Sequence, residues 1–104
     1  MQDRREVLIV LFDLPSVTKG ERADAARFRK ELLKLGYTAL QKSVYIKLLR
    51  GTENKRIEIE NVRNAAPDGN IYFLPLSLNV FKKMKSIKGF QFDFSFFSDD
   101  VFIY

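Results

Sequence analysis

Residues 7–15 read VLIVLFDLP, and this stretch decides the fold. The six consecutive large apolar residues 7–12 predict a strand that is buried on both faces or nearly so. The carboxylate of Asp13 ends the apolar run, and Pro15 makes the chain change direction. We therefore expect Asp13 at the rim of a sheet, beside apolar neighbours, where the first strand turns toward a helix.

The residues after Pro15 predict a helix with one apolar side. Thr18 and Glu21 have the spacing of a capping box, in which each side chain accepts a backbone N–H of the first turn. Gly36 is a typical end of such a helix. The apolar stripe has helical spacing and consists of Ala25, Phe28, Leu32 and Leu35. The other sides carry the basic residues Arg22, Arg27, Arg29, Lys30 and Lys34.

The middle of the chain predicts two strands and a second helix. Residues 37–49 are rich in β-branched and aromatic side chains, with a polar break at 41–43, which indicates two short strands or one bent strand. Gly51 and Thr52 then open a helix expected over residues 53–66. Its apolar face is expected to contain Ile57, Ile59, Val62 and Ala65.

A last strand is expected over residues 71–76, stopped near Pro75, and a single helical turn over residues 80–85. The order strand, helix, strand, strand, helix, strand is that of an α+β fold, the ferredoxin-like βαββαβ sandwich. We therefore predict a four-stranded antiparallel sheet with both helices on one face. Residues 1–104 are expected to form a single domain, with its core at 6–77 and a C-terminal turn and partner strand at 78–104.

The C-terminal tail predicts a fifth strand with an aromatic face, because four phenylalanines alternate with other residues: Phe90, Phe92, Phe94 and Phe96. Four strands already complete the sandwich, and an exposed aromatic patch is a liability for a monomer. We therefore expect these phenylalanines at the interface of a two-fold homodimer. The segment Lys88-Gly89-Phe90-Gln91-Phe92 fails the RNA-recognition signature, since Gln91 stands where a small residue is needed.

Composition excludes several kinds of chemistry. The chain has 104 residues and contains neither cysteine nor histidine, which excludes disulfides, thiolate metal sites and histidine-based triads. Residues 19–56 hold eleven basic side chains against four acidic ones, a balance that favours a polyanionic partner and also fits a solvated basic surface. No apolar run is long enough to span a membrane, and the first residues lack a signal-peptide pattern, so we expect a soluble cytoplasmic protein.

Asp13 has two readings. An aspartate before a proline-containing turn often only caps local backbone N–H groups. A single carboxylate is also a poor Mg²⁺ site. If a dimer axis passes near the end of the first strand, however, two Asp13 carboxylates face each other, and their repulsion raises one pKa unless a cation lies between them. Both readings stay open on the residues alone.

A resemblance joins these motifs. The chain resembles the CRISPR-associated "Cas-two" family, especially the branch that accompanies single-effector systems, from about residue 7 to residue 84. The matching positions are Asp13, Leu14-Pro15, Thr18-Lys19, Glu21-Arg22, Phe28-Arg29-Lys30, Leu32-Leu33, Gly36, Gln41-Lys42-Ser43-Val44-Tyr45, Ser77, Phe81 and Met84. The resemblance implies a ferredoxin-like homodimer that holds foreign duplex DNA on its basic surface and bridges the CRISPR integrase during spacer acquisition.

The resemblance also implies a Mg²⁺-dependent endonuclease that acts on RNA or on DNA. Asp13 matches the aspartate that each subunit contributes to a shared Mg²⁺, and Tyr45 and Arg22 match positions near an aromatic residue and an arginine that matter in some nuclease-active members. The sequence departs from the pattern at two positions. Phe12 stands where a tyrosine is common, and Ala39 where some relatives have an arginine; both bear on the nuclease more than on the scaffold.

Two functions follow as expectations. As a scaffold, the homodimer binds double-stranded DNA through phosphate contacts of Arg22, Arg27, Arg29 and Lys30 and offers its tail to the integrase. As a nuclease, paired Asp13 residues hold Mg²⁺, with Tyr45 as a second catalytic candidate and single-stranded RNA as a second substrate. An alternative is a ribonuclease toxin of the same fold that has no integrase partner.

Overall fold

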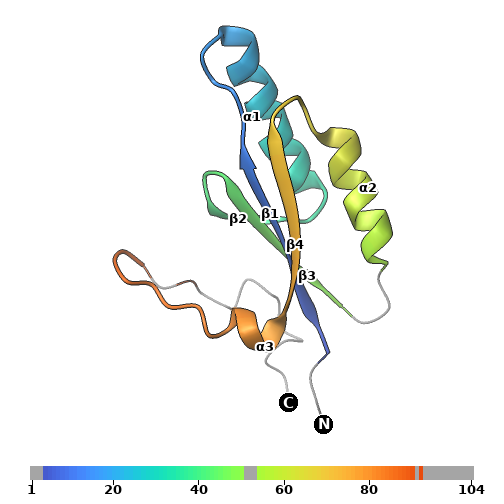
Figure 1. Ribbon diagram of the computed structural model, residues 1–104, viewed down its shortest axis with the longest axis vertical. Coiled ribbons are helices and arrows are strands. Elements are labelled where there is room, and N and C mark those ends of the chain that lie inside the picture. The colour runs from blue at the N-terminus through green and yellow to red at the C-terminus, as the bar shows by residue number, and fades with distance from the viewer. Residues whose placement is uncertain (1–3, 51–53, 91, 93–104) are drawn as a thin grey trace.

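The computed structural model describes residues 4–50, 54–90 and 92. Within them a four-stranded antiparallel sheet in the order β2-β3-β1-β4 carries two long helices on one face (Figure 1). The elements in chain order are β1 (Glu6–Asp13), α1 (Lys19–Lys34), β2 (Thr38–Gln41), β3 (Val44–Leu49), α2 (Lys55–Ala65), β4 (Asn70–Ser77) and α3 (Leu78–Phe81). The predicted ferredoxin-like fold is therefore confirmed, and its strands span the expected core, 6–77.

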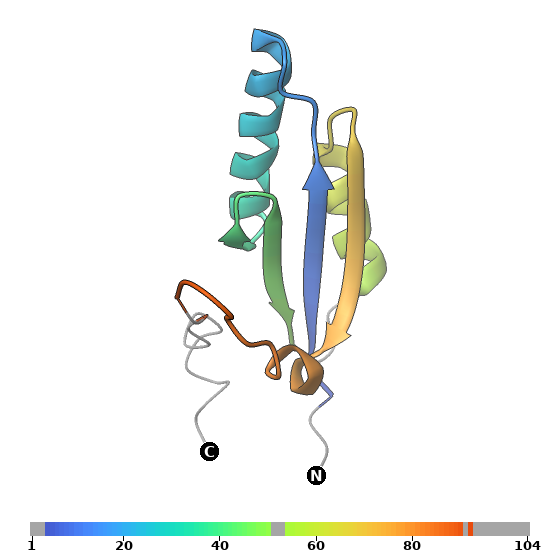
Figure 2. The ribbon, with the colours of Figure 1, turned by 60° about the vertical axis from the view of Figure 1, so that its left-hand side comes forward.

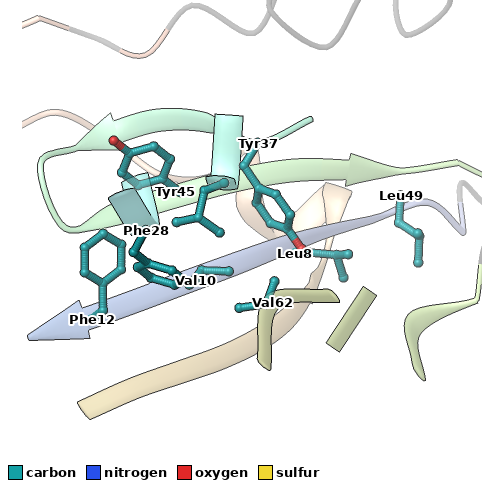
Figure 3. Close-up of a cluster of buried hydrophobic side chains, with 9 residues drawn as sticks. Leu8, Val10, Phe12, Phe28, Tyr37, Tyr45, Leu49 and Val62 are labelled. Atoms are coloured by element: carbon teal, nitrogen blue, oxygen red, sulfur yellow. The ribbon is translucent and has the colours of Figure 1, made fainter. Parts of the chain in front are cut away.

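Strand β1 is central and buried on both faces, as the run of apolar residues predicted. It pairs with β3 on one side and with β4 on the other. Leu8, Val10 and Phe12 face α1 and α2, in the cluster drawn in Figure 3. Val7 and Ile9 face the other side, where α3 supplies part of the cover. Alternating side chains of one strand thus serve two separate apolar layers.

Helix α1 forms as predicted. Thr18 is its N-cap, and the reciprocal bonds of the capping box with Glu21 are both present. The stripe residues Ala25, Phe28 and Leu32 are buried against the sheet. The helix ends at Leu35, its C-cap, after which Gly36 adopts a φ of 96°, a conformation that favours glycine.

Helix α2 corrects two predictions. It begins at Lys55 with Asn54 as N-cap, later than expected, while residues 51–53 lie outside the described residues. Ile57 was expected on the apolar face, yet its side chain is 58% exposed, and Glu58 is buried instead. The physical reason is an ion pair, because Glu58 turns inward to meet Lys47 of β3.

Strand β4 spans Asn70–Ser77, one residue longer at each end than predicted, and includes Pro75. Proline is tolerated there because β4 is the last strand of the described sheet, and the outer backbone groups of an edge strand need no partner. The helical turn expected at 80–85 is instead Leu78–Phe81, because the Ser77 hydroxyl caps it by accepting the Val80 N–H at 3.1 Å.

The predicted fifth strand is not seen in the described part of the tail. Phe90 and Phe92 adopt no regular secondary structure, and Phe94 and Phe96 lie outside the described residues. A strand beyond residue 92 therefore stays a prediction. None of the helices in the described ranges is long and apolar enough to cross a membrane.

Candidate functional site

Asp13 lies where the sequence predicted, at the rim of the sheet. It is the last residue of β1, and its side chain is exposed. Strand alternation places it on the same face as Ile9 and Leu11, the face that α1 and α2 leave free. Directly opposite in the neighbouring strand β4 is Asn70. A carboxylate and an amide oxygen therefore share one corner of the helix-free face.

Beside this corner lies an apolar surface that the sequence did not reveal. We call it the open sheet face; it consists of Leu11, Val44, Tyr72 and Leu74, which the strand pairing places next to one another. Tyr72 is 65% and Leu74 45% exposed. Helix α3 sits at the other end of the sheet, as Figure 2 shows. Leu11 and Val44 are partly buried against the cluster that α3 helps to form, whereas Tyr72 and Leu74 stay exposed. The sequence predicts only that this segment is a strand. Which of its side chains remain exposed depends on the strand pairing, which the sequence does not show.

The turn that follows Asp13 is tightly held. The Arg22 Nη1 group donates to the carbonyls of Val17 at 2.7 Å and Ser16 at 3.3 Å. The Glu21 carboxylate accepts the N–H groups of Val17 and Thr18. These bonds tie residues 16–18, which follow Asp13 in the chain, to the first turn of α1.

A second contact holds the same turn from the side of β4. Gly69 has a φ of 143°, and a side chain there would meet Leu14 Cδ2 at 2.6 Å. The glycine is thus needed both for its backbone conformation and for the close approach of the two turns. Asp13 and Asn70 are held at the same rim by this approach.

The four basic residues predicted to bind nucleic acid lie on the outer part of α1, where three of them already have partners. Arg22 braces the turn described above, and Arg27 forms an exposed ion pair with Asp24 at 3.0 Å. Arg29 Nε donates to the Lys42 carbonyl in the β2–β3 turn at 3.2 Å. Among the described residues, the Lys30 ammonium has no ion pair or hydrogen bond. A guanidinium has five N–H donors, so the arginines keep donors for a phosphate.

Tyr45 is not brought together with Asp13. It is buried in the helix-side cluster, where its ring lies 5.8 Å from that of Phe12 (Figure 3). Asp13 leaves the sheet on the opposite face. Within one subunit the two predicted catalytic residues therefore do not share a site, and a joint role remains a prediction.

The described residues do not complete a metal site by themselves. Residues 4–50, 54–90 and 92 contain no group of three or more acidic side chains placed to hold a cation. Asp13 and Asn70 offer one carboxylate and one amide oxygen, which suit a hard cation that keeps several waters. A second carboxylate from another copy of the chain would bring the corner to the one or two carboxylates that Mg²⁺ commonly uses.

A buried polar cluster lies on the other side of the sheet and escaped sequence reasoning. Lys47 Nζ bonds both carboxylate oxygens of Glu58, at 3.0 and 3.1 Å, and the Leu35 carbonyl at 2.9 Å. Burial, and then the charge of Glu58, raise the pKa of the neighbouring Tyr37 phenol well above its usual range. The cluster joins β3 to α2 and to the end of α1, so its role is structural.

The phenylalanines predicted for the dimer interface behave differently from one another. The Phe92 ring packs edge-on against Phe81 with a centroid distance of 5.8 Å. Phe90 is fully exposed. The two described members of the set therefore do not form a common aromatic face within the subunit.

Comparison with known proteins gives a consistent result. The family model described as CRISPR associated protein Cas2 matches residues 6–84. A relative from Campylobacter jejuni, named CRISPR-associated endoribonuclease Cas2, is 36% identical over 90 residues, which cover 86% of this chain and 63% of the relative. This chain therefore matches less than two thirds of that relative's length.

Two further relatives carry the same name. The protein from Flavobacterium psychrophilum is 35% identical over 83 residues, covering 79% of this chain and 72% of its own length. The protein from Parvibaculum lavamentivorans is 36% identical over 83 residues, covering 79% of this chain and 82% of its own length. The region matched by the family model, residues 6–84, includes all four strands of the sheet.

Proposed function

This chain belongs to the CRISPR-associated Cas2 family, and we propose that it acts in spacer acquisition as a homodimer that binds duplex DNA and bridges the CRISPR integrase. The observation that carries the proposal is the position of Asp13 at the edge of the open sheet face. Co-purification with the integrase tests the bridging role, and a dimer that fails to bind the integrase would contradict it.

The open sheet face supports the homodimer. Exposed contiguous apolar surface on a small protein usually marks an interaction site. A second copy related by a two-fold axis would cover Tyr72 and Leu74 with the same residues of its own sheet. Because Asp13 and Asn70 stand on that face, the same contact would bring the two carboxylates toward each other. This interface is proposed in addition to the aromatic tail.

The outer side of α1 supports binding to a duplex. Arg22 and Arg29 are seven residues apart, nearly two turns, and share one side of the helix, with Lys30 next to them. Contacts of such groups to phosphates carry no sequence information. Binding would therefore be independent of sequence and would weaken steeply with salt, because bound counterions are released.

A salt titration tests this binding. Labelled duplexes of two unrelated sequences should bind equally, and log Kd should rise linearly with log salt concentration. Lys30→Glu should weaken binding, whereas Arg56→Glu should not, because Arg56 lies on α2, outside the proposed surface. Arg56 is also an exposed helical cation, so this variant controls for the change of charge. Affinity that does not change between low and moderate salt would exclude a phosphate-based surface.

A Mg²⁺-dependent nuclease is the second candidate function, and the name that the relatives carry, CRISPR-associated endoribonuclease, favours it. When bound, Mg²⁺ would polarise the phosphate of the substrate and activate a water molecule as the nucleophile. Asp13 would hold the cation and Asn70 would orient its water shell. Because the chain has no histidine, no imidazole is present to move a proton. The buried Tyr45 would support Phe12 and the end of β1 rather than touch the substrate.

The nuclease is tested by comparing the wild type with Asp13→Asn on RNA and on DNA, each with Mg²⁺ and with EDTA. The proposal expects cleavage only by the wild type with Mg²⁺. Equal cleavage in every condition would point to a contaminating enzyme. Retained DNA binding by Asp13→Asn would show that the scaffold and the nuclease are separate properties.

A further inference from the structure

A groove of about 740 Å³ runs along the edge strand β2, where Gln41 pairs with Val44 of the open sheet face. Residues 39–41 form one wall. The other wall is the segment that follows α3, residues 84–88 together with Phe90 and Phe92. Figure 2 shows this segment leaving α3 at the end of the sheet and passing on the β2 side. Of these wall residues, only Phe90 and Phe92 have been given a role above, as part of the predicted aromatic dimer interface.

The outer wall combines positive charge with bare apolar surface. Lys85 and Lys88 are exposed, and within the described residues neither ammonium has an ion pair. Between and beside them, Ile87 is 97% exposed and the Phe90 ring is fully exposed. Within the described residues, packing does not explain a fully exposed phenylalanine ring close to two cations that have no ion pair.

The turn that presents Phe90 is locally built. The Ser86 hydroxyl donates to the Lys88 carbonyl at 3.1 Å. Gly89 adopts a φ of 95°, which a residue with a side chain rarely adopts. The next described aromatic residue, Phe92, packs against Phe81 and anchors the far end of the turn. Phe90 is therefore exposed, while the turn before it is held by the Ser86 bond and Phe92 packs against Phe81.

We propose that this groove binds a single-stranded nucleic acid, with one base stacked on Phe90 and the adjacent phosphates at Lys85 and Lys88. Positively charged grooves with exposed aromatic rings bind single strands in this way. A duplex would not use the ring, because its bases are already stacked on each other. The inference rests on the proposed nucleic-acid function but uses residues different from those of α1.

This assignment competes with the expectation that Phe90 lies in a dimer interface. Phe92 has a partner within the subunit and Phe90 has none, so the two need not share a role. A second copy covering Phe90 would remove the ring from water even without nucleic acid. The two assignments therefore differ in what the ring contacts in the free protein.

A single fluorophore tests the proposal. The chain contains no tryptophan, so Phe90→Trp places the only indole in the groove. Short single-stranded RNA should quench its emission in a saturable manner, since stacked bases quench indoles. Phe90→Ala should weaken binding of the same RNA by about tenfold or more, and Lys85→Ala with Lys88→Ala should weaken it at low salt. Val80→Trp is the matched control, because Val80 is exposed on α3 and does not line the groove.

Two outcomes would overturn the inference, and a third would separate it from the proposed function. If single-stranded RNA leaves the emission of Phe90→Trp unchanged while a labelled duplex still binds, the groove fails and the proposed function stands. Emission that is already shifted to the blue in free protein would mean that the tail or a second copy covers the ring. Quenching that persists while duplex binding is absent would support the groove and contradict the proposed scaffold.

Discussion

Asp13 and Asn70 stand opposite each other at the paired ends of β1 and β4, on the face of the sheet that α1 and α2 leave uncovered. The pairing depends on the register of β4 against β1, because a shift of β4 by one residue would turn the Asn70 side chain to the helix side, away from Asp13. The pair gives this corner of the sheet two oxygen ligands for a cation, one from a charged carboxylate and one from a neutral amide. Gly69 and the Arg22 contacts fix both turns around it.

The Asp13–Asn70 pair predicts a graded response to substitution. Asn70→Ala should weaken divalent-cation binding by about tenfold, the loss typical for a residue that orients a metal site. Asp13→Asn should remove binding altogether. Mn²⁺ binding measured by electron paramagnetic resonance checks the order. Equal affinities for the wild type and Asn70→Ala would show that the amide takes no part.

The open sheet face predicts the oligomeric state. Leu74→Lys should convert the proposed homodimer into a monomer, because it places an ammonium in the centre of the proposed interface. The free subunit should lose little stability, since this side chain is already 45% exposed. Light scattering at micromolar concentration measures the change. Ile57→Lys is the control on α2, and a monomer produced equally by both variants would contradict this interface.

The ion pair between Lys47 and Glu58 predicts a large effect on stability. Glu58→Ala leaves a buried ammonium without its partner and should lower the free energy of unfolding by about 3–5 kcal/mol. The double variant Lys47→Met with Glu58→Leu should regain most of this loss. Urea unfolding measures both.

Glu60→Ala provides the control for this pair. Glu60 pairs with Arg63 on the exposed side of the same helix, and loss of an exposed pair should change stability by less than about 1 kcal/mol. If Glu58→Ala and Glu60→Ala had similar effects, the buried cluster would not be what holds α2 to the sheet.

Tyr37 predicts how stability responds to alkaline pH. Burial and the charge of Glu58 raise the pKa of its phenol in the folded state, whereas the unfolded chain should release this proton near pH 10. Below that pH the phenol is neutral in both states. As pH rises above about 10, the unfolded state alone loses the proton, so the folded state becomes relatively less stable.

Tyr37→Phe should remove this part of the pH dependence. The hydroxyl is buried and finds no hydrogen-bond partner among the described residues, so the variant should be close to the wild type at pH 7. Unfolding by urea at pH 7 and near pH 10.5 measures the difference. The same loss of stability in both proteins on going to high pH would exclude Tyr37 as its source.

The sequence predicted the fold because its local signals agree with one another. The run of apolar residues in β1 predicted a strand buried on both faces. The capping box of Thr18 and Glu21 predicted the start of α1. Asp13 at the rim followed from the end of that run. Local propensity, turn chemistry and burial pattern all favoured the same arrangement.

The remaining features depend on contacts that are distant in the chain. The inward turn of Glu58 requires Lys47 from another element, and an isolated helix pattern favoured Ile57 instead. The open sheet face is visible only once the register of β4 is known. The predicted strand at 71–76 fell one residue short at each end of β4, and sequence alone does not tell that β4 is an edge strand, in which proline is tolerated.

The shared cation site is the central claim, and a count of bound Mn²⁺ tests it most directly. Mn²⁺ prefers oxygen ligands as Mg²⁺ does, and its free ion can be measured by electron paramagnetic resonance while protein is added. Two Asp13 residues around one ion predict one tightly bound cation for every two chains, lost in Asp13→Asn. One cation for every chain, or a count unchanged by that substitution, would contradict the account.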